Sequence, residues 1–317
     1  MHEGSRKAIA AAFFANLGIA IAKFVAFGFT GAASMLAEAI HSVADTGNQG
    51  LLFLGGQRAK KAATRLHQFG YGRERYFWSF VVALVLFSLG AMFALYEGIN
   101  KLRHPHELES PTIAFVVLGV AIVLEVFSLR TAVREARPAR GERTWWNYIR
   151  TARLPELPVV LLEDIGALTG LVFALTGVAV SVATDDPAYD ALGSISIGVL
   201  LAIIAIILMV EMKSLLIGEA AEPHEQAAIR AAIQADPSVD HVIHLRTQHL
   251  GPDELLVVAK VDLGSRSAAE LYEQIDALEA RVRAAVPHAR VIYVEPGEFD
   301  PAKSGAGRIS RGAEAPL

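Results

Sequence analysis

The chain has 317 residues, of which 53% are hydrophobic and 20% charged, with a formal net charge of −4 and a mean hydropathy of +0.39. A composition this apolar is unlike that of an ordinary soluble domain, and the small acidic excess argues against a nucleic-acid-binding protein. Because the chain contains no cysteine, disulfides and thiolate metal sites are excluded, and any metal must be bound by His, Asp, Glu or backbone oxygen.

Six segments are long and apolar enough to cross a bilayer, which requires about 20 residues each. These spans are predicted at 8–28, 33–54, 76–99, 113–131, 158–183 and 190–212. Arg6 and Lys7 precede the first, which has no convincing processing site. We therefore interpret it as a membrane span and not as a cleaved signal peptide.

The pattern changes at residue 218, where amphipathic segments replace the long apolar ones. EPHEQAAIRAAIQADPSVD and SAAELYEQIDALEARVRAAV are typical of amphipathic helices. VIHLRTQHL, ELLVVAKVDL and ARVIYVEP are typical of strands, the first two joined by a turn at residues 251–253. We therefore predict a transmembrane domain at 1–217 and a small α+β domain at 218–298. Residues 299–317 are poor in large apolar side chains, and we expect a disordered tail there.

Basic residues predict the orientation in the membrane, because they gather on the cytoplasmic side. They precede the first span and fill the connections at 58–75 and 130–153, whereas the last connection carries Asp185, Asp186 and Asp190. With six spans, both termini and the α+β domain are expected in the cytoplasm, and the host membrane is expected to be a bacterial inner membrane.

The second span carries three ionisable side chains at membrane depth. Such a group costs roughly 2.5–3.5 kcal/mol at the bilayer centre, so it needs a compensating partner or function. Glu38, His41 and Asp45 are spaced i, i+3, i+7, and Asn48 follows a further turn along. On a helix, these residues share one face.

Carboxylates in two other spans are predicted at a similar depth. Counted from the span ends, Asp45 of the second span, Glu125 of the fourth and Asp164 of the fifth lie at about the same level, and Glu163 precedes Asp164. With His41, one turn from Asp45, they predict a cation site. Oxygen ligands with one imidazole suit Zn²⁺ and would accept Mn²⁺, Fe²⁺ or Co²⁺.

Structural roles compete with this interpretation for several residues. Glu38 fits interhelical packing or helix-end solvation as well as it fits ion binding, and Glu125 fits a structural pair with a basic or amide group. Lys23 and Asn16 of the first span are interpreted as snorkelling and packing groups.

The segments NLGIAIAKFVAFGFTGAASMLAEAIHSVADTGNQGLL and HQFGYGRERYFW resemble the first two spans and the following loop of the cation diffusion facilitator family. YDALGSISIGVLL resembles the start of the family's sixth span, and VIYVEP the closing strand of its ferredoxin- or metallochaperone-like cytoplasmic domain. EAIHSVADTGNQGLL and VVLLEDIGAL are most similar to the branch that contains the mitochondrial zinc transporter.

The resemblance implies a homodimer that exports a divalent metal ion, Zn²⁺ foremost, in exchange for protons by alternating access. It implies no cofactor besides the transported ion. Carried over by position, His41 and Asp45 are ligands from the second span and Asp164 is a ligand from the fifth.

The chain departs from the family pattern at two places. Val160 stands where the fifth span usually has a His, so Glu163 or Glu125 is expected to supply that ligand, with Glu38 a further candidate. In the α+β domain, the histidines do not match the family's ligand positions, so dimer contact is expected there rather than metal binding. These are His224, His241, His244, His249 and His288.

Other functions are weighed against transport. An Fe²⁺, Mn²⁺ or Co²⁺ exporter of the same fold, a channel, a metal sensor and a membrane-embedded metalloenzyme all use buried polar residues. No HExxH pattern occurs, and no nucleophile has an evident base, which argues against an enzyme.

Overall fold

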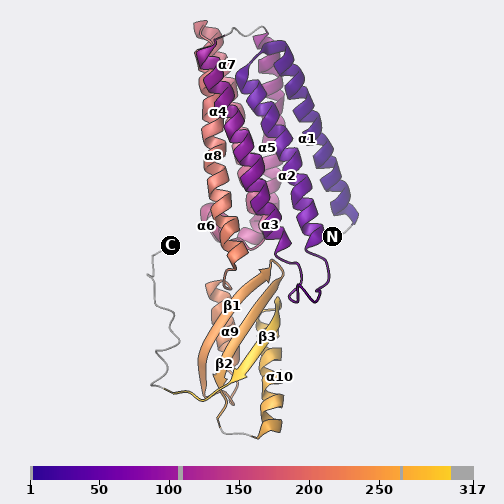
Figure 1. Ribbon diagram of the computed structural model, residues 1–317, viewed down its shortest axis with the longest axis vertical. Coiled ribbons are helices and arrows are strands. Elements are labelled where there is room, and N and C mark those ends of the chain that lie inside the picture. Colours follow the sequence, from indigo (N-terminus) through magenta and orange to yellow (C-terminus); the bar gives the residue numbers. More distant parts are fainter. Residues whose placement is uncertain (1–2, 106–109, 265–266, 301–317) are drawn as a thin grey trace. The chain divides into compact units, whose positions relative to one another are not determined.

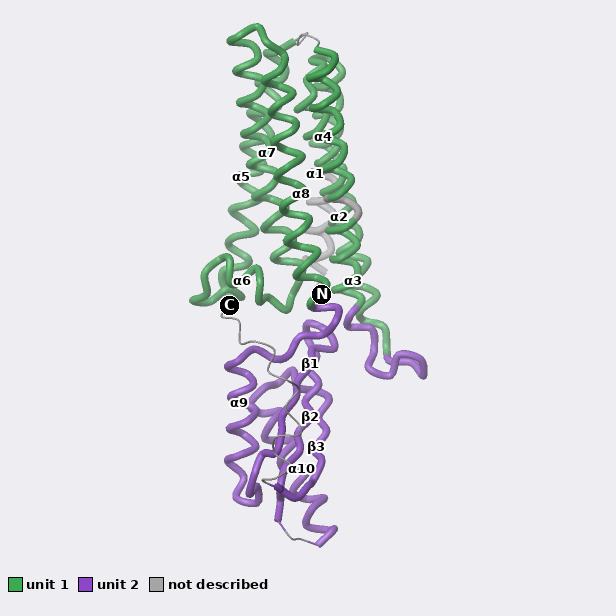
Figure 2. Tube along the Cα trace, turned by 60° about the vertical axis from the view of Figure 1, so that its left-hand side comes forward, with its two compact units in different colours: residues 1–62, 74–214 green, residues 63–73, 215–317 purple. Residues whose placement is uncertain are grey.

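The chain forms two compact units (Figure 2). The computed structural model describes residues 3–105, 110–264 and 267–300. The first unit, called the helical unit below, contains the residues up to 62 and 74–214, and the second contains 63–73 and the residues from 215 on. The connection 63–73 therefore belongs with the C-terminal part of the chain rather than with the helices that flank it.

Long helices build the helical unit (Figure 1), and they extend beyond the predicted spans at one or both ends. In chain order they are α1 (Glu3–Thr30), α2 (Ala33–Arg58), α3 (Glu74–Val81), the π-helical segment η1 (Val82–Phe87), α4 (Ser88–Arg103), α5 (Pro111–Arg140), α6 (Trp145–Thr151), α7 (Glu156–Thr184) and α8 (Ala188–Ile217). The short helix α6 was not predicted. Its N-cap is Thr144, whose hydroxyl accepts a hydrogen bond from the Asn147 amide at 3.2 Å.

Four stretches of helix are long and apolar enough to cross a membrane: Glu74–Arg103, Pro111–Arg140, Glu156–Thr184 and Ala188–Ile217. Within α1, Leu17–Thr30 is a shorter apolar stretch of helix. Length and composition thus identify four strongly apolar helices, as a membrane domain requires, while the count of six spans stays a prediction.

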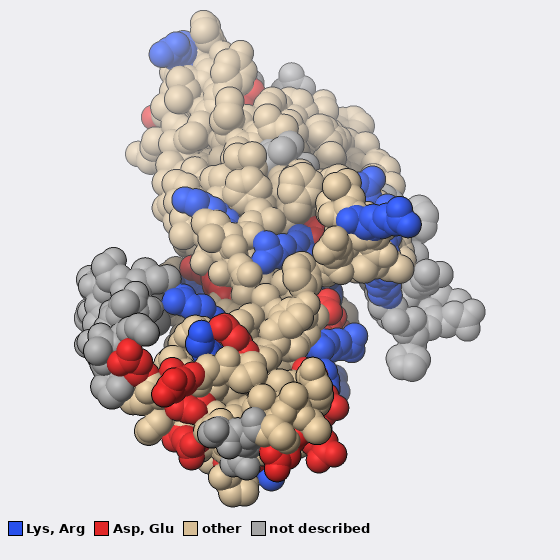
Figure 3. Space-filling view, turned by 60° about the horizontal axis from the view of Figure 1, so that its bottom comes forward, with Lys and Arg blue, Asp and Glu red and all other residues tan. Residues whose placement is uncertain are grey.

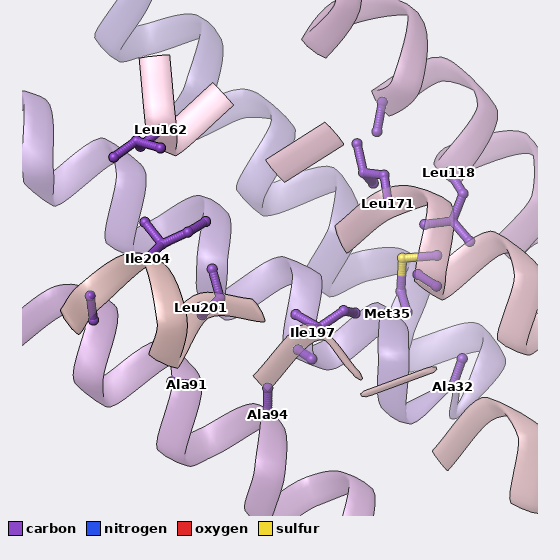
Figure 4. Close-up of a cluster of buried hydrophobic side chains, with 14 of the residues drawn as sticks. Ala32, Met35, Ala91, Ala94, Leu118, Leu162, Leu171, Ile197, Leu201 and Ile204 are labelled. Carbon is purple, nitrogen blue, oxygen red and sulfur yellow. The ribbon is translucent and has the colours of Figure 1, made fainter. Parts of the chain in front are cut away.

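The core of the helical unit surrounds α2, which contacts α1, α3, α4 and α7. Several of its large apolar side chains are at most 1% exposed, and these come from four helices (Figure 4). They include Met35, Leu118, Leu171, Ile197 and Leu201. Because neighbours cover α2 on several sides, its polar side chains are buried as well.

Charge is also buried where α1 joins α2 and α7 joins α8. Asp190 of α8 accepts hydrogen bonds from the Ala33 amide at 2.9 Å, from Lys101 Nζ at 2.9 Å and from the Ser34 hydroxyl. We call these four residues the Asp190 cluster. Asp190 was counted with the acidic connection before the last span, but it lies within α8, which begins at Ala188, and its side chain is fully buried. There it caps the N-terminus of α2.

The second unit contains a three-stranded sheet with two helices. Its elements are α9 (Pro223–Gln234), β1 (His241–Gly251), β2 (Glu254–Asp262), α10 (Ala268–Ala285) and β3 (Ala289–Pro296). The strand order is β1-β2-β3, with β1 antiparallel and β3 parallel to β2. Alternate residues of β2 are buried in one core with α9 and α10, so the predicted small α+β domain is confirmed.

The connection between α2 and α3 packs on the turn between β1 and β2. A Cβ on Gly72 would lie 2.8 Å from the Leu250 carbonyl oxygen, and one on Gly251 would lie 2.8 Å from Gly72 Cα. Only glycine allows two backbones to approach this closely. The predicted tail lies mostly outside the described residues, which end at residue 300.

Candidate metal-transport site

A polar stripe follows the buried face of α2. Glu38, His41, Ser42, Asp45 and Asn48 recur at three- and four-residue intervals, and none is more than 7% exposed. This spacing puts them on one side of the helix, as the sequence predicted for four of them. The stripe helps to explain why α2 is less apolar than α1 and α7, two of the helices that it contacts.

His41 and Asp45 are in direct contact on this stripe. His41 Nδ1 lies 3.5 Å from an Asp45 carboxylate oxygen, one helical turn away. An imidazole and a carboxylate held this close can reach the same ion, and both ligand types bind Zn²⁺.

The two acidic residues of α7 contact different helices. Glu163 accepts a hydrogen bond from the Asn48 amide group of α2. Asp164 accepts one from the Ser128 hydroxyl of α5, at 3.3 Å from both carboxylate oxygens. Adjacent residues on a helix point about 100° apart, so α7 presents one carboxylate toward α2 and the other toward α5.

Carboxylates of α2, α5 and α7 are close enough to repel one another electrostatically. Asp45 is repelled by Glu125, Glu38 and Asp164 and attracted by Lys23, and Glu163 is repelled by Asp45, Asp164 and Glu125. Buried carboxylates that repel one another are stabilised by a bound cation or by protons. The arrangement can therefore exchange a bound cation for protons.

Within the part of the chain that the structure describes, no group of three or more His, Asp or Glu side chains lies close enough to hold one ion. Of the expected ligands, the structure brings His41 and Asp45 into contact and leaves Glu163 and Asp164 with polar neighbours on α2 and α5. A site with three or four protein ligands requires these side chains to leave their present partners and turn toward a common point.

The expectation that Lys23 snorkels toward the membrane surface is wrong. Lys23 is 1% exposed, and its ammonium group donates to Glu38 Oε2 at 3.1 Å and to the Ser42 hydroxyl at 2.8 Å. A buried carboxylate holds the lysine inside the bundle because two opposite charges compensate each other there. Gly170 of α7 makes room for this pair, since a Cβ at Gly170 would lie 2.5 Å from Glu38 Oε1.

Sequence reasoning missed Ser128 as a site residue. The residue lies three positions after Glu125, which puts both on one side of α5, and this spacing was the available signal. In the second unit, His249 and His288 stack with ring centroids 6.0 Å apart, and His288 Nε2 lies 3.2 Å from a Glu225 oxygen.

Comparisons with known proteins relate the chain to cation efflux proteins. A family model described as a cation efflux transmembrane domain matches residues 9–217. The mitochondrial proton-coupled zinc antiporter SLC30A9 of Mus musculus is 34% identical over 253 residues, which cover 79% of this chain and 44% of that protein.

Two further relatives are more distant. Metal tolerance protein C4 of Arabidopsis thaliana is 28% identical over 270 residues, 84% of this chain and 59% of that protein. Magnetosome protein MamB of Magnetospira sp. (strain QH-2) is 26% identical over 296 residues, 89% of this chain and 92% of that protein. The chain thus spans less than half the length of the SLC30A9 relatives and nearly the whole length of MamB.

Proposed function

We propose, since the chain belongs to the cation efflux family, that it exports a divalent metal ion, Zn²⁺ foremost, in exchange for protons by alternating access. The observation that carries the proposal is the buried stripe of α2, where His41 and Asp45 touch and repelling carboxylates of α5 and α7 lie nearby. Family membership favours a transporter over a membrane-embedded enzyme. The proton-coupled zinc relative supports the choice of ions.

We assign His41, Asp45 and Asp164 as ligands of the transported ion and Glu163 as the fourth. Each has a neutral or weakly held partner that a metal ion can replace: His41 and Asp45 have each other, Asp164 has Ser128 and Glu163 has Asn48. Both carboxylates and imidazole bind either a proton or a metal ion, so uptake of one releases the other.

Glu38 and Glu125 have supporting roles in this proposal. Glu38 is held by Lys23 and lies against Gly170, which leaves it less free to turn toward an ion. Glu125 of α5 is partly exposed and adds negative charge near Asp45.

We propose six membrane spans with both termini in the cytoplasm. A 26-residue helix is about 39 Å long at 1.5 Å per residue, so α2 exceeds a hydrocarbon core of about 30 Å. Its polar stripe faces protein, which is where spanning helices keep ionisable residues. The basic connections at 58–75 and 130–153 then face the cytoplasm.

In the same proposal, residues 1–217 form the transmembrane domain, 218–298 the cytoplasmic domain and 299–317 a disordered tail. The protein is a homodimer in a bacterial inner membrane, with contacts between the cytoplasmic domains.

Metal-dependent proton flux in vesicles tests the function. The full chain is reconstituted with a pH-sensitive dye inside, and Zn²⁺, Mn²⁺, Fe²⁺, Co²⁺, Mg²⁺ and Ca²⁺ are added in turn. We expect saturable proton movement opposite to the metal, largest with Zn²⁺ and absent with Ca²⁺, because a site with one imidazole favours borderline ions over hard ones.

His41→Ala is the matched control for this assay and should abolish the flux in protein that still inserts. Metal flux that does not saturate would identify a channel, and flux without proton movement would refute antiport. A preference for Mn²⁺, Fe²⁺ or Co²⁺ would replace zinc as the substrate and leave the mechanism standing.

A further inference from the structure

One exposed stripe of α5 changes from apolar to basic along its length. Its residues follow one another at intervals of four and three, which keeps them on one side of the helix. The apolar part is 56–72% exposed and consists of Val116, Val120, Val123 and Phe127. The basic part consists of Arg130, Arg134 and Arg137, all exposed. We call these three residues the arginine stripe.

Within the described part of the chain, the charges of the arginine stripe are not paired. No hydrogen bond or ion pair joins these three guanidinium groups to a described residue. Other arginines of the same unit do pair, as Arg75 does with Glu156 at 2.5 Å and Arg150 with Glu211 at 3.4 Å.

The segment that contains the stripe is basic as a whole. Residues 130–153 contain seven arginines and two glutamates, a net charge of +5 in a chain whose total is −4. Figure 3 shows several basic side chains on the helical unit, with uncharged surface and a few acidic side chains around them. The stripe therefore attracts anions.

The level of the stripe along α5 corresponds to a membrane boundary. Arg130 follows Pro111 by 19 residues, or about 29 Å of helix, which matches a hydrocarbon core of about 30 Å. The valines and Phe127 then face acyl chains, and the arginines reach the headgroup region. Trp146 of the neighbouring helix α6 is 54% exposed, and exposed Trp is typical of this interface.

We propose that Arg130, Arg134 and Arg137 bind the headgroup of an anionic phospholipid whose acyl chains lie along Val123 and Phe127. Guanidinium groups bind phosphate in a bidentate manner, and clusters of basic residues at a membrane boundary select anionic lipids. A second copy of the chain is a poor occupant, because it would need acidic groups at the level of an apolar-to-basic boundary. The proposal rests on α5 crossing the bilayer and is independent of metal transport.

Lipid retention tests the proposal. The full chain is placed in nanodiscs with equal amounts of phosphatidylglycerol and phosphatidylcholine, released, and examined by native mass spectrometry. We expect wild type to retain phosphatidylglycerol preferentially. The variant Arg130→Gln/Arg134→Gln/Arg137→Gln should lose that preference by at least about tenfold, since each basic residue contributes to attraction by an anionic leaflet.

The matched control is Lys60→Gln/Lys61→Gln/Arg65→Gln, which removes three exposed positive charges from another connection. It should keep the preference. Arg134→Gln alone should give an intermediate loss, so that a triple variant that fails to insert still leaves a result.

Three outcomes would overturn the proposal. They are wild type without lipid preference, equal losses in the stripe and control variants, and displacement of phosphatidylglycerol by an equal concentration of glycerol 3-phosphate. The last would assign the arginines to a soluble phosphate compound.

Discussion

Two of the places where the helical unit buries charge are built differently. In the Asp190 cluster, one carboxylate meets one ammonium group and also accepts hydrogen bonds from Ala33 and Ser34. Around His41, the carboxylates of Asp45, Glu163 and Asp164 repel one another, and their direct partners are an imidazole and neutral donors, while the Lys23 ammonium attracts Asp45. We call His41, Asp45, Glu163 and Asp164 together the α2–α7 acidic group.

The difference separates a structural role from a transport role. A buried charge with an opposite charge and a full set of hydrogen bonds is compensated by the protein itself. Repelling carboxylates with neutral partners are compensated only when a cation or protons are added. The first arrangement fixes helices, and the second binds and releases positive charge.

The largest expected effect comes from breaking the Asp190 cluster. Asp190→Ala leaves Lys101 buried without its counter-ion, which is expected to lower the free energy of unfolding by about 3–5 kcal/mol. Thermal unfolding of the full chain in detergent measures it. Asp185→Asn, at an exposed acid of the same connection, is the control and should change little. A melting temperature equal to that of wild type would show that the cluster has no structural role.

Removing charge from the α2–α7 acidic group should impair transport and leave the stability of the fold unchanged. Asp45→Asn is expected to reduce metal-dependent proton flux at least 100-fold, about 2.7 kcal/mol, without lowering the melting temperature, because it removes a repelling charge. Vesicle flux and thermal unfolding are measured on the same preparation, with Glu135→Gln on exposed α5 surface as control. Residual flux above a tenth of wild type, or loss of the fold, would contradict the assignment.

Two substitutions compared side by side show whether Glu163 or Glu125 is the fourth ligand. Glu163→Gln should weaken zinc-dependent flux by about 10-fold or more, whereas Glu125→Gln should change it by less than about threefold, since loss of a ligand costs more than loss of a nearby charge. Both variants are assayed side by side over a range of Zn²⁺ concentrations. The reverse order would make Glu125 the fourth ligand.

The smallest expected effect concerns a hydrogen bond at the edge of the acidic group. Ser128→Ala removes the hydroxyl that donates to Asp164 and should alter flux by about fivefold, the worth of about 1 kcal/mol. Ser196→Ala, at a hydroxyl that bonds within its own helix, is the control. An effect no larger than the control's would place Ser128 outside the transport path.

Sequence patterns predicted the structural features that depend on residues close together in the chain. The polar face of α2 followed from the spacing of Glu38, His41 and Asp45, and the strands followed from alternation. Contacts between residues distant in sequence could not be predicted from these patterns. Asp190 is 89 residues from Lys101 and 156 from Ser34, and beside two other acids it had the composition of a surface connection.

Long side chains were a second source of error. Lys23 can reach either water or the protein interior from the same backbone position, and the choice depends on a carboxylate 15 residues away on the next helix. Helix geometry places Glu163 and Asp164 about 100° apart, while the packing of α7 against α2 and α5 decides which helix each contacts.

The account rests on a divalent ion binding to the α2–α7 acidic group, and anomalous X-ray scattering at the zinc edge from crystals of the zinc-loaded chain tests it most directly. We predict a zinc peak about 2.0–2.2 Å from an imidazole nitrogen of His41 and from carboxylate oxygens of Asp45 and Asp164. A zinc-loaded chain whose His41 and Asp164 keep their present partners, with the peak elsewhere, would contradict the account.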